Sequence, residues 1–245
     1  MPAVAILPAM RPRTLLDRAV DLLFPLRCAG CGAFDTALCP ACEARLQPAV
    51  GPGRCGNCSA AWDGADFCPR CFGWRELAGV RSVYEHAGAA RALVHRLKYQ
   101  RYRALAPLMA ARVAPLAASL PVDGWVAVPL HRSRERDRGF NQAELLLRHA
   151  GLPPAPARLR RVRNTGSQVR RTAAARAAAL AGAFAAEGPP LDGLVIGLID
   201  DVITSGATAR ECARALLDHG ACRVWAVSFT RASLDLSAPE APIDD

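Results

Sequence analysis

The sequence predicts an α/β protein with a mostly parallel sheet flanked by helices, preceded by a small cysteine-rich module. Two observations carry this prediction. Along residues 80–231, apolar runs typical of buried strands alternate with helical segments, and this alternation favours a parallel sheet. Before that region, eight of the ten cysteines lie within 44 residues. A chain of 245 residues can hold two such unequal parts.

The predicted elements define four regions. Residues 1–25 form a leader with a short helix at 14–24, and residues 26–74 form the cysteine module. Residues 80–231 form the α/β domain, and residues 232–245 form an acidic tail without stable structure. Within the domain we expect helices at 89–99, 105–120, 140–149, 172–186 and 207–219. We expect strands at 80–84, 125–128, 194–199 and 223–229.

The clustered cysteines form four CxxC pairs. Such a pair lets two thiolates reach one metal ion from a tight turn, and two pairs complete a tetrahedral site. The spacing therefore predicts two structural Zn²⁺ sites, with the first pair joined to the second and the third to the fourth as the simplest choice. The predicted ligands are Cys28, Cys31, Cys39, Cys42, Cys55, Cys58, Cys68 and Cys71.

Other uses of these cysteines stay open. Disulfides are typical of secreted chains, and the start of this sequence makes a poor secretory signal. An iron–sulfur cluster or a redox-active pair is compatible with the same spacing, as is an interleaved choice of ligands. Cys212 and Cys222 lie outside the cluster, and we interpret them as small apolar core residues.

The predicted strand at 194–199 ends in two adjacent acids, Asp200 and Asp201. A loop rich in hydroxyl groups follows, and it leads into the helix at 207–219. The first N–H groups of a helix are unpaired and lie at the positive pole of its dipole, so this loop can hold a phosphate. Acids that bind hydroxyl groups or a metal, beside a phosphate cradle, predict a sugar-phosphate site.

This segment resembles the phosphoribosyl pyrophosphate (PRPP) motif of type I phosphoribosyltransferases. In that family two acids hold the ribose hydroxyl groups, and a Thr/Ser/Gly loop holds the 5′-phosphate. The resemblance implies that Asp200 and Asp201 bind ribose and that Mg²⁺ accompanies PRPP. The residues that it implies for the phosphate are Thr204, Ser205, Gly206, Ala207 and Thr208.

A basic segment follows the predicted strand at 125–128. Arg132, Arg134, Arg136 and Arg138 fall within seven residues, and their forked guanidinium groups can neutralise a pyrophosphate. A spacing of two does not form one helical face, so we expect a loop wrapped around an anion. Lys98 is the one lysine among 31 basic residues, and it is a further candidate for phosphate binding.

Positive charge is concentrated in the middle of the chain. Residues 91–176 contain 18 basic and four acidic residues, whereas the whole chain carries a net charge of +9. Such a segment suits an anionic ligand or a nucleic acid. A solvated basic surface without a partner is the alternative.

Four ordered motifs occur along the chain: HRLKY at 95–99, RGFNQ at 138–142, Gln168 with Arg176, and DDVITSGAT at 200–208. Together they make the chain similar to the ComF family. Members of that family resemble phosphoribosyltransferases, carry an N-terminal zinc ribbon module and are linked to DNA uptake in competent bacteria. The resemblance covers about residues 15–231 and implies a double zinc ribbon followed by a type I phosphoribosyltransferase-like domain.

Three functions are compatible with these features. The first is binding of PRPP or a related ligand, with Asp200 and Asp201 as catalytic residues if an acceptor displaces pyrophosphate. The second is a non-catalytic protein that binds single-stranded DNA or competence proteins during DNA uptake. The third is a nucleobase salvage phosphoribosyltransferase. No uncharged apolar run of about 18 residues occurs, so we expect a cytoplasmic protein without membrane insertion.

Overall fold

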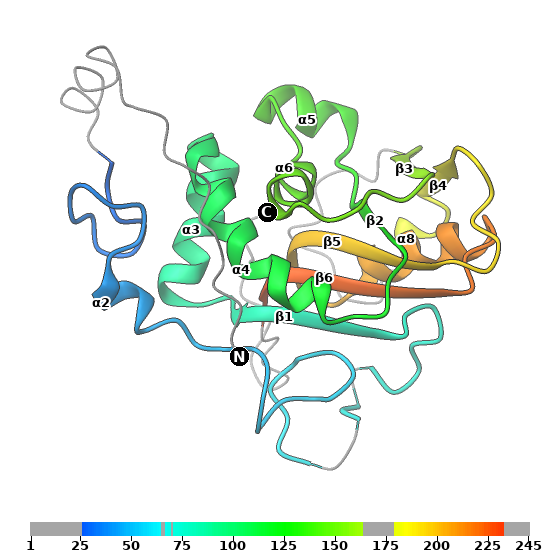
Figure 1. Cartoon of the computed structure of the whole chain (residues 1–245), viewed down its shortest axis with the longest axis horizontal. Helices are drawn as coiled ribbons and strands as arrows, with labels where there is room; N and C mark the ends of the chain where they lie inside the picture. Colours follow the sequence, from blue (N-terminus) through cyan, green and yellow to red (C-terminus); the bar gives the residue numbers. More distant parts are fainter. Residues whose placement is uncertain (1–25, 65–66, 70, 164–178, 233–245) are drawn as a thin grey trace, which may run out of the picture.

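The computed structural model describes residues 26–64, 67–69, 71–163 and 179–232 (Figure 1). The leader, the acidic tail and the motif residues Gln168 and Arg176 lie outside these ranges. The strands are β1 Gly79–Glu85, β2 Gly124–Ala127, β3 Arg158–Arg161, β4 Phe184–Glu187, β5 Val195–Ile203 and β6 Arg223–Arg231. The helices are α2 Pro40–Glu43, α3 Gly88–Tyr99, a 3₁₀ turn at Arg103–Leu105, α4 Ala106–Ala118, α5 Arg132–Arg138, α6 Gln142–Ala150 and α8 Ala207–Leu217.

The main sheet has four strands in the order β1-β6-β5-β2, and every neighbouring pair is parallel. Both faces of the sheet are covered. On one face α3, α4 and α6 pack against side chains such as Ile199 and Phe229. On the other face α8 and the second half of the cysteine module pack against side chains such as Leu198. Successive β5 residues therefore enter opposite cores, which explains why the strand is apolar without alternation.

The α/β architecture with a parallel sheet and a preceding cysteine module is confirmed. One boundary differs in a way that matters for the site. The strand that was expected to end at Ile199 continues through both acids to Ile203, because Val202 and Ile203 still pair with Thr230 and Arg231 of β6. The acids thus lie inside a strand, and their backbones are fixed by the sheet.

The arginine-rich segment is a helix, so the expected loop around an anion is wrong. His131 caps α5 by accepting a hydrogen bond from the Ser133 N–H at Nδ1, and Gly139 ends the helix at φ 79°. These end signals, rather than the arginine spacing, determine the local structure. A spacing of two on a helix sends successive arginines to opposite sides, so the four cannot all converge on one ligand.

A second correction concerns the helix expected at 172–186. Residues 164–178 lie outside the described part, but Phe184–Glu187 is a strand, β4, rather than the end of a helix. It pairs antiparallel with β3, a strand that the sequence did not predict, and Gly182 turns the chain into it at φ 65°. Alanine favours helices and is depleted in strands, so pairing with β3 outweighs the intrinsic preference of this segment.

Candidate functional site

The eight clustered cysteines gather into two sites. Within each site all four Sγ atoms lie within 4.8 Å of one another, and all eight are unpaired thiols. Sulfur pairs approach to 3.5–3.7 Å, close to the separation of about 3.8 Å that a tetrahedral site with Zn–S bonds of about 2.3 Å requires. The sequential pairing is the one observed. The first site holds Cys28, Cys31, Cys39 and Cys42, and the second holds Cys55, Cys58, Cys68 and Cys71.

The two sites repeat one backbone design. The Cys39 N–H donates to Cys28 Sγ at 3.3 Å, and the Cys68 N–H donates to Cys55 Sγ at the same distance. Burial alone would raise the pKa of Cys28, but N–H groups that face its sulfur, that of Cys39 first among them, lower that pKa to about 6. The same balance lowers the pKa of Cys55 to about 6. Such sulfurs favour the thiolate that Zn²⁺ binds.

The two acids on β5 lie in different surroundings. Asp201 is 1% exposed, and its carboxylate contacts Lys98 Nζ of α3 at 3.1 Å and accepts a hydrogen bond from Gln142 Nε2 of α6 at 3.2 Å. Although burial opposes the charge, the Lys98 cation leaves the pKa of Asp201 below its ordinary value. Burial, followed by the charge of Asp201, raises the pKa of Asp200 well above its ordinary value. Asp201 therefore stays ionised, and Asp200 is the acid whose protonation state can change.

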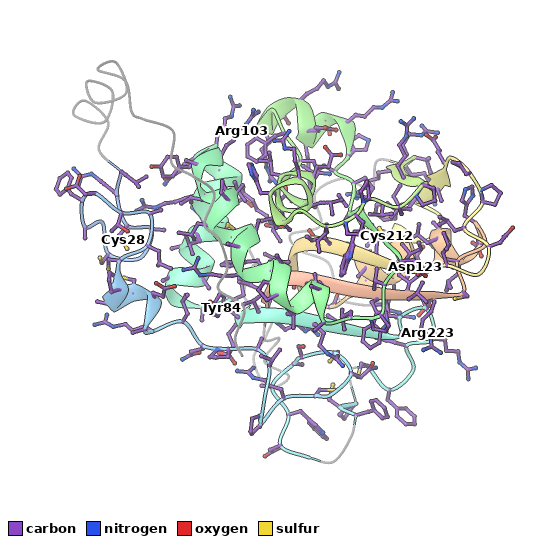
Figure 2. All side chains as sticks on the ribbon, in the orientation of Figure 1. Cys28, Tyr84, Arg103, Asp123, Cys212 and Arg223 are labelled. Carbon is purple, nitrogen blue, oxygen red and sulfur yellow. The ribbon has the colours of Figure 1, made fainter. Side chains whose placement is uncertain are left out.

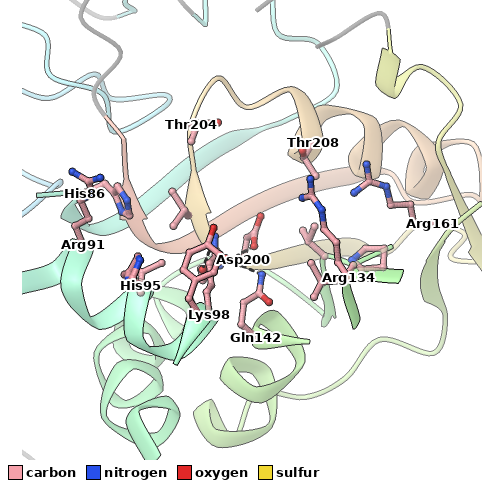
Figure 3. Close-up of a pocket in the computed structure, with 17 residues that line it drawn as sticks. His86, Arg91, His95, Lys98, Arg134, Gln142, Arg161, Asp200, Thr204 and Thr208 are labelled. Atoms are coloured by element: carbon pink, nitrogen blue, oxygen red, sulfur yellow. Dashed lines mark hydrogen bonds and ion pairs between the residues drawn. The ribbon is translucent and has the colours of Figure 1, made fainter. Parts of the chain in front are cut away.

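A pocket opens over these acids at the carboxyl ends of the strands (Figure 3). Asp200 lies at its centre, with Lys98 and Gln142 beneath and Thr204 and Thr208 on the opposite wall. Ligand pockets in open α/β sheets form at this edge. The ionisable and hydrogen-bonding side chains that line it are His86, Arg91, His95, Lys98, Tyr99, Arg134, Gln142, Arg161, Asp200, Asp201, Thr204 and Thr208.

The loop at 204–208, which we call the phosphate loop, joins β5 to α8. Gly206 is the N-cap of α8 at φ 80°, and Ser205 Oγ accepts a hydrogen bond from the Ala207 N–H at 3.4 Å. Thr204 and Thr208 face the pocket, whereas Ser205 takes part through this turn. Because α8 begins here, its first N–H groups and its dipole are directed at the pocket.

The predicted basic ligands are only partly brought together. Arg134 lines the pocket, but Arg132 and Arg136 lie outside its lining. Arg138 is also outside the lining, and it donates to Gln142 Oε1 at 2.6 Å, so it supports the residue that holds Asp201. Lys98 reaches the site, yet it is the partner of Asp201 instead of an independent phosphate ligand.

Several residues that line the pocket were not predicted as site residues from the sequence. Arg91, His95 and Lys98 lie on α3 at spacings of four and three residues, which places them on one face of the helix. The helical period of residues 88–99 could therefore have identified Arg91 and His95 from the sequence. Arg161 comes from β3, a strand that the residue pattern does not predict. His86 follows β1 directly and had no motif to mark it.

His86 is held as a neutral imidazole. The Thr230 hydroxyl donates to the Asp201 carbonyl at 3.3 Å, so the hydrogen atom between Thr230 Oγ1 and His86 Nδ1, which are 2.9 Å apart, belongs to the imidazole. Burial, then the Lys98 charge, lowers the pKa of His86 to about 4. Its Nε2 is therefore unprotonated at neutral pH and can accept a proton or a hydrogen bond.

Known proteins match both parts of the chain. Residues 19–72 match the double zinc ribbon domain family. The DNA utilization protein YhgH of Salmonella typhimurium is 34% identical over 220 residues, covering 83% of this chain and 88% of that protein. The chain belongs to the ComF family. Other ComF relatives are the competence protein ComFC of Bacillus subtilis, at 26% identity with 76% of this chain and 80% of that protein covered, and competence protein F of Haemophilus influenzae, at 28% with 84% and 97% covered.

A solved structure, UMP synthase of Leishmania donovani, matches with a TM-score of 0.33 and 19% identity over 61% of this chain. This chain spans 26% of that longer one. In the described part of the ComF chain, no helix has the length and apolar character that crossing a bilayer requires.

Three ComF motifs meet in one network. Lys98 of the first motif contacts Asp201 of the last, Gln142 of the second donates to the same carboxylate, and Arg138 donates to Gln142. Figure 3 shows Lys98 and Gln142 below Asp200. The ComF motif residues therefore hold the buried carboxylate of Asp201 in place, and the pocket lies over this network.

Proposed function

We propose that the protein binds PRPP, or a closely related phosphoribosyl ligand, together with Mg²⁺ in this pocket during DNA uptake. The observation that carries the proposal is the junction of β5 and α8. It sets two carboxylates beside a loop that begins a helix, at the ligand-binding edge of a parallel sheet. Relatives named for DNA utilization and competence support the biological setting.

The proposed roles follow the geometry. Thr204, Thr208 and the first N–H groups of α8 would hold the 5′-phosphate. Asp200 would hold ribose hydroxyl groups and, as a hard oxygen ligand, fits Mg²⁺. Arg134 and Arg161 would face the pyrophosphate. Asp201 positions Lys98 and Gln142 and supplies fixed negative charge near a ribose that becomes cationic during transfer.

Calorimetry with PRPP and Mg²⁺ tests the proposal. The Asp200→Asn variant keeps the size of the side chain and removes a charge that burial disfavours, so it should fold as the wild type does. We expect wild type to bind and Asp200→Asn to lose at least about tenfold in affinity, the loss typical of one charged hydrogen-bonding group. Asp218→Asn, at the far end of α8, is the matched control and should bind normally. Absence of heat with wild type would rule out PRPP binding.

A second candidate function is binding of single-stranded DNA. Its support is three exposed aromatic rings on the cysteine module, Phe34 in its first half and Phe67 and Phe72 in its second, with exposures of 54%, 56% and 80%. Arg27 is stacked 3.9 Å above the Phe34 ring. Exposed rings beside cations provide base-stacking positions. Affinity for an oligonucleotide should then fall steeply as salt rises, and no binding at low salt would exclude this function.

Nucleobase salvage is a further proposal that the same pocket admits. It predicts release of pyrophosphate from PRPP only when a purine or pyrimidine is added.

We also propose a cytoplasmic location, because eight unpaired thiols in metal-binding arrangements suit a reducing compartment. We also propose residues 26–74 and 80–231 as the two functional units of the chain.

A further inference from the structure

The second four-cysteine site lies directly against the phosphate loop, and Arg231 joins the two. Arg231 ends β6 and is 1% exposed. Its Nε donates to the Cys58 carbonyl at 2.9 Å, and its Nη1 donates to the Ile203 carbonyl at 2.9 Å and to the Thr204 carbonyl. One buried guanidinium thus connects the backbone of a metal ligand to the first residue of the phosphate loop.

Trp74 makes a second connection. It follows Cys71 by three residues, and its N–H donates to the Cys71 carbonyl at 3.0 Å. Its indole lies on Gly206, so closely that a Cβ added to Gly206 would come within 2.5 Å of Trp74 Cη2. Gly206 is therefore required both by its positive φ of 80° and by the ring that covers it. The conformation of the loop and the position of Trp74 depend on each other.

A third connection fixes the helix that the loop begins. Glu76 forms a two-pronged ion pair with Arg210 of α8, at 2.9 Å from each of two guanidinium nitrogens. The Arg210 N–H in turn donates to the Gly206 carbonyl at 2.9 Å. Residues 71–76 are thereby attached to the loop and to the first turn of α8. Forked pairs of this kind restrict orientation as well as distance.

The first site is attached elsewhere. Cys28, Leu38 and Cys42 belong to the apolar cluster of α3 and α4, and Arg96 of α3 donates to the Arg27 carbonyl at 3.2 Å. Figure 2 shows Cys28 at one edge of the molecule, beside α2 and away from Cys212 of α8. The two sites therefore support different walls of the pocket.

We propose that the second four-cysteine site, acting through Arg231 and Trp74, holds the phosphate loop in its anion-binding conformation. Both are positioning residues. The inference rests on the proposed function, because it concerns the affinity of the same pocket for a phosphorylated ligand. A loop that is ordered before binding loses less conformational entropy when the ligand arrives, so the metal state of this site controls affinity. The first site instead controls the order of α3.

Hydrogen exchange on the full zinc-loaded chain tests this directly. Trp74→Leu removes the ring over Gly206, and Trp62→Leu is the matched control, since Trp62 covers Gly64 of the same ribbon. We expect Trp74→Leu to increase amide exchange at residues 204–208 by about tenfold or more relative to Trp62→Leu, with α3 unchanged. Trp74→Phe should restore most of the protection. A Trp74→Leu loop that exchanges no faster than that of Trp62→Leu would overturn the inference.

Metal-site variants and ligand binding complete the test. Cys58→Ser should loosen residues 204–208, whereas Cys31→Ser should loosen residues 88–99 and leave the loop protected. Calorimetry with PRPP and Mg²⁺ should show weaker binding by about tenfold for Trp74→Leu than for Trp62→Leu. If the wild type binds but the two tryptophan variants bind equally well, the contact of Trp74 with the phosphate loop does not affect the affinity for PRPP. If the wild type does not bind PRPP, the proposed ligand is wrong, and the exchange result still decides whether the loop is held by the ribbon.

Discussion

At the scale of single residues, the two neighbouring aspartates of β5 differ in their partners and in their pKa values. Asp201 is enclosed by Lys98 and Gln142, whereas Asp200 faces the pocket with an elevated pKa. The sequence predicted both acids but could not distinguish them, because adjacent residues on a strand differ only in the face to which they point. The pairing of Lys98 with Asp201 was likewise invisible, since 103 residues separate them along the chain.

The Lys98–Asp201 pair predicts a specific pattern of stability. Lys98→Met leaves a buried carboxylate without its cation, so it should lower the free energy of unfolding by about 3–5 kcal/mol. Lys98→Met combined with Asp201→Asn removes both charges and should recover part of that loss. Urea denaturation of the two single variants and the double variant measures the coupling. Additive effects would show that the pair does not act as a unit.

His86 predicts a pH dependence in the acid range. Its pKa is about 4 in the folded protein, below the ordinary value of about 6.5 that applies when the chain is unfolded. Between these values the unfolded chain binds the proton that the folded protein refuses, so stability contributed by neutral His86 is present above pH 6.5 and is lost as pH falls toward 4. Nitrogen NMR should find the Nδ1–H form throughout pH 5.5–8. Titration near pH 6.5 would contradict this.

At the scale of elements, the sequence predicted those whose pattern is local and missed those that depend on pairing. The strand at β5, the helix α8 and the turn between them follow from an apolar run, a hydroxyl-rich loop and a helical period. Helix α5 was not predicted, because histidine is not among the common N-cap residues and the arginine spacing favoured a loop. Strands β3 and β4 stabilise each other across 22 residues, for which short-range patterns carry no signal.

The β5–α8 turn predicts a strong effect of one methyl group. Gly206→Ala meets an unfavourable φ and the Trp74 ring, so it should lower the free energy of unfolding by about 1–3 kcal/mol and weaken phosphate-ligand binding. Gly193→Ala, also at positive φ but with open space around it, should cost only the conformational part. Thermal and urea unfolding compare the two. Equal losses would show that the Trp74 contact contributes nothing.

At the scale of the whole molecule, a parallel sheet provides one pocket edge and two metal sites support its opposite walls. The first site packs on α3, which carries Lys98, and the second packs on the phosphate loop. The fold class, the two sites and the ComF membership could all be predicted from ordered motifs. The attachment of each ribbon to its own wall could not, because it depends on side chains such as Arg231 that meet only in the folded chain.

Metal content is the prediction that belongs to this scale. Elemental analysis should find two zinc ions per chain, and a strong chelator should release both. Chelation should also lower the melting temperature, because a segment as short as 26–74 is expected to depend on metal for its folding. Iron with visible absorbance would point instead to clusters. A melting temperature unchanged by complete metal removal would show that the sites are not structural.

The central proposal is that this pocket binds a phosphoribosyl ligand. A crystal structure of the protein with PRPP and Mg²⁺ tests it most directly. We predict the 5′-phosphate at residues 204–208, the ribose hydroxyl groups at Asp200, and the pyrophosphate facing Arg134 and Arg161. PRPP bound at another surface, or an empty pocket at saturating PRPP concentration, would contradict the account.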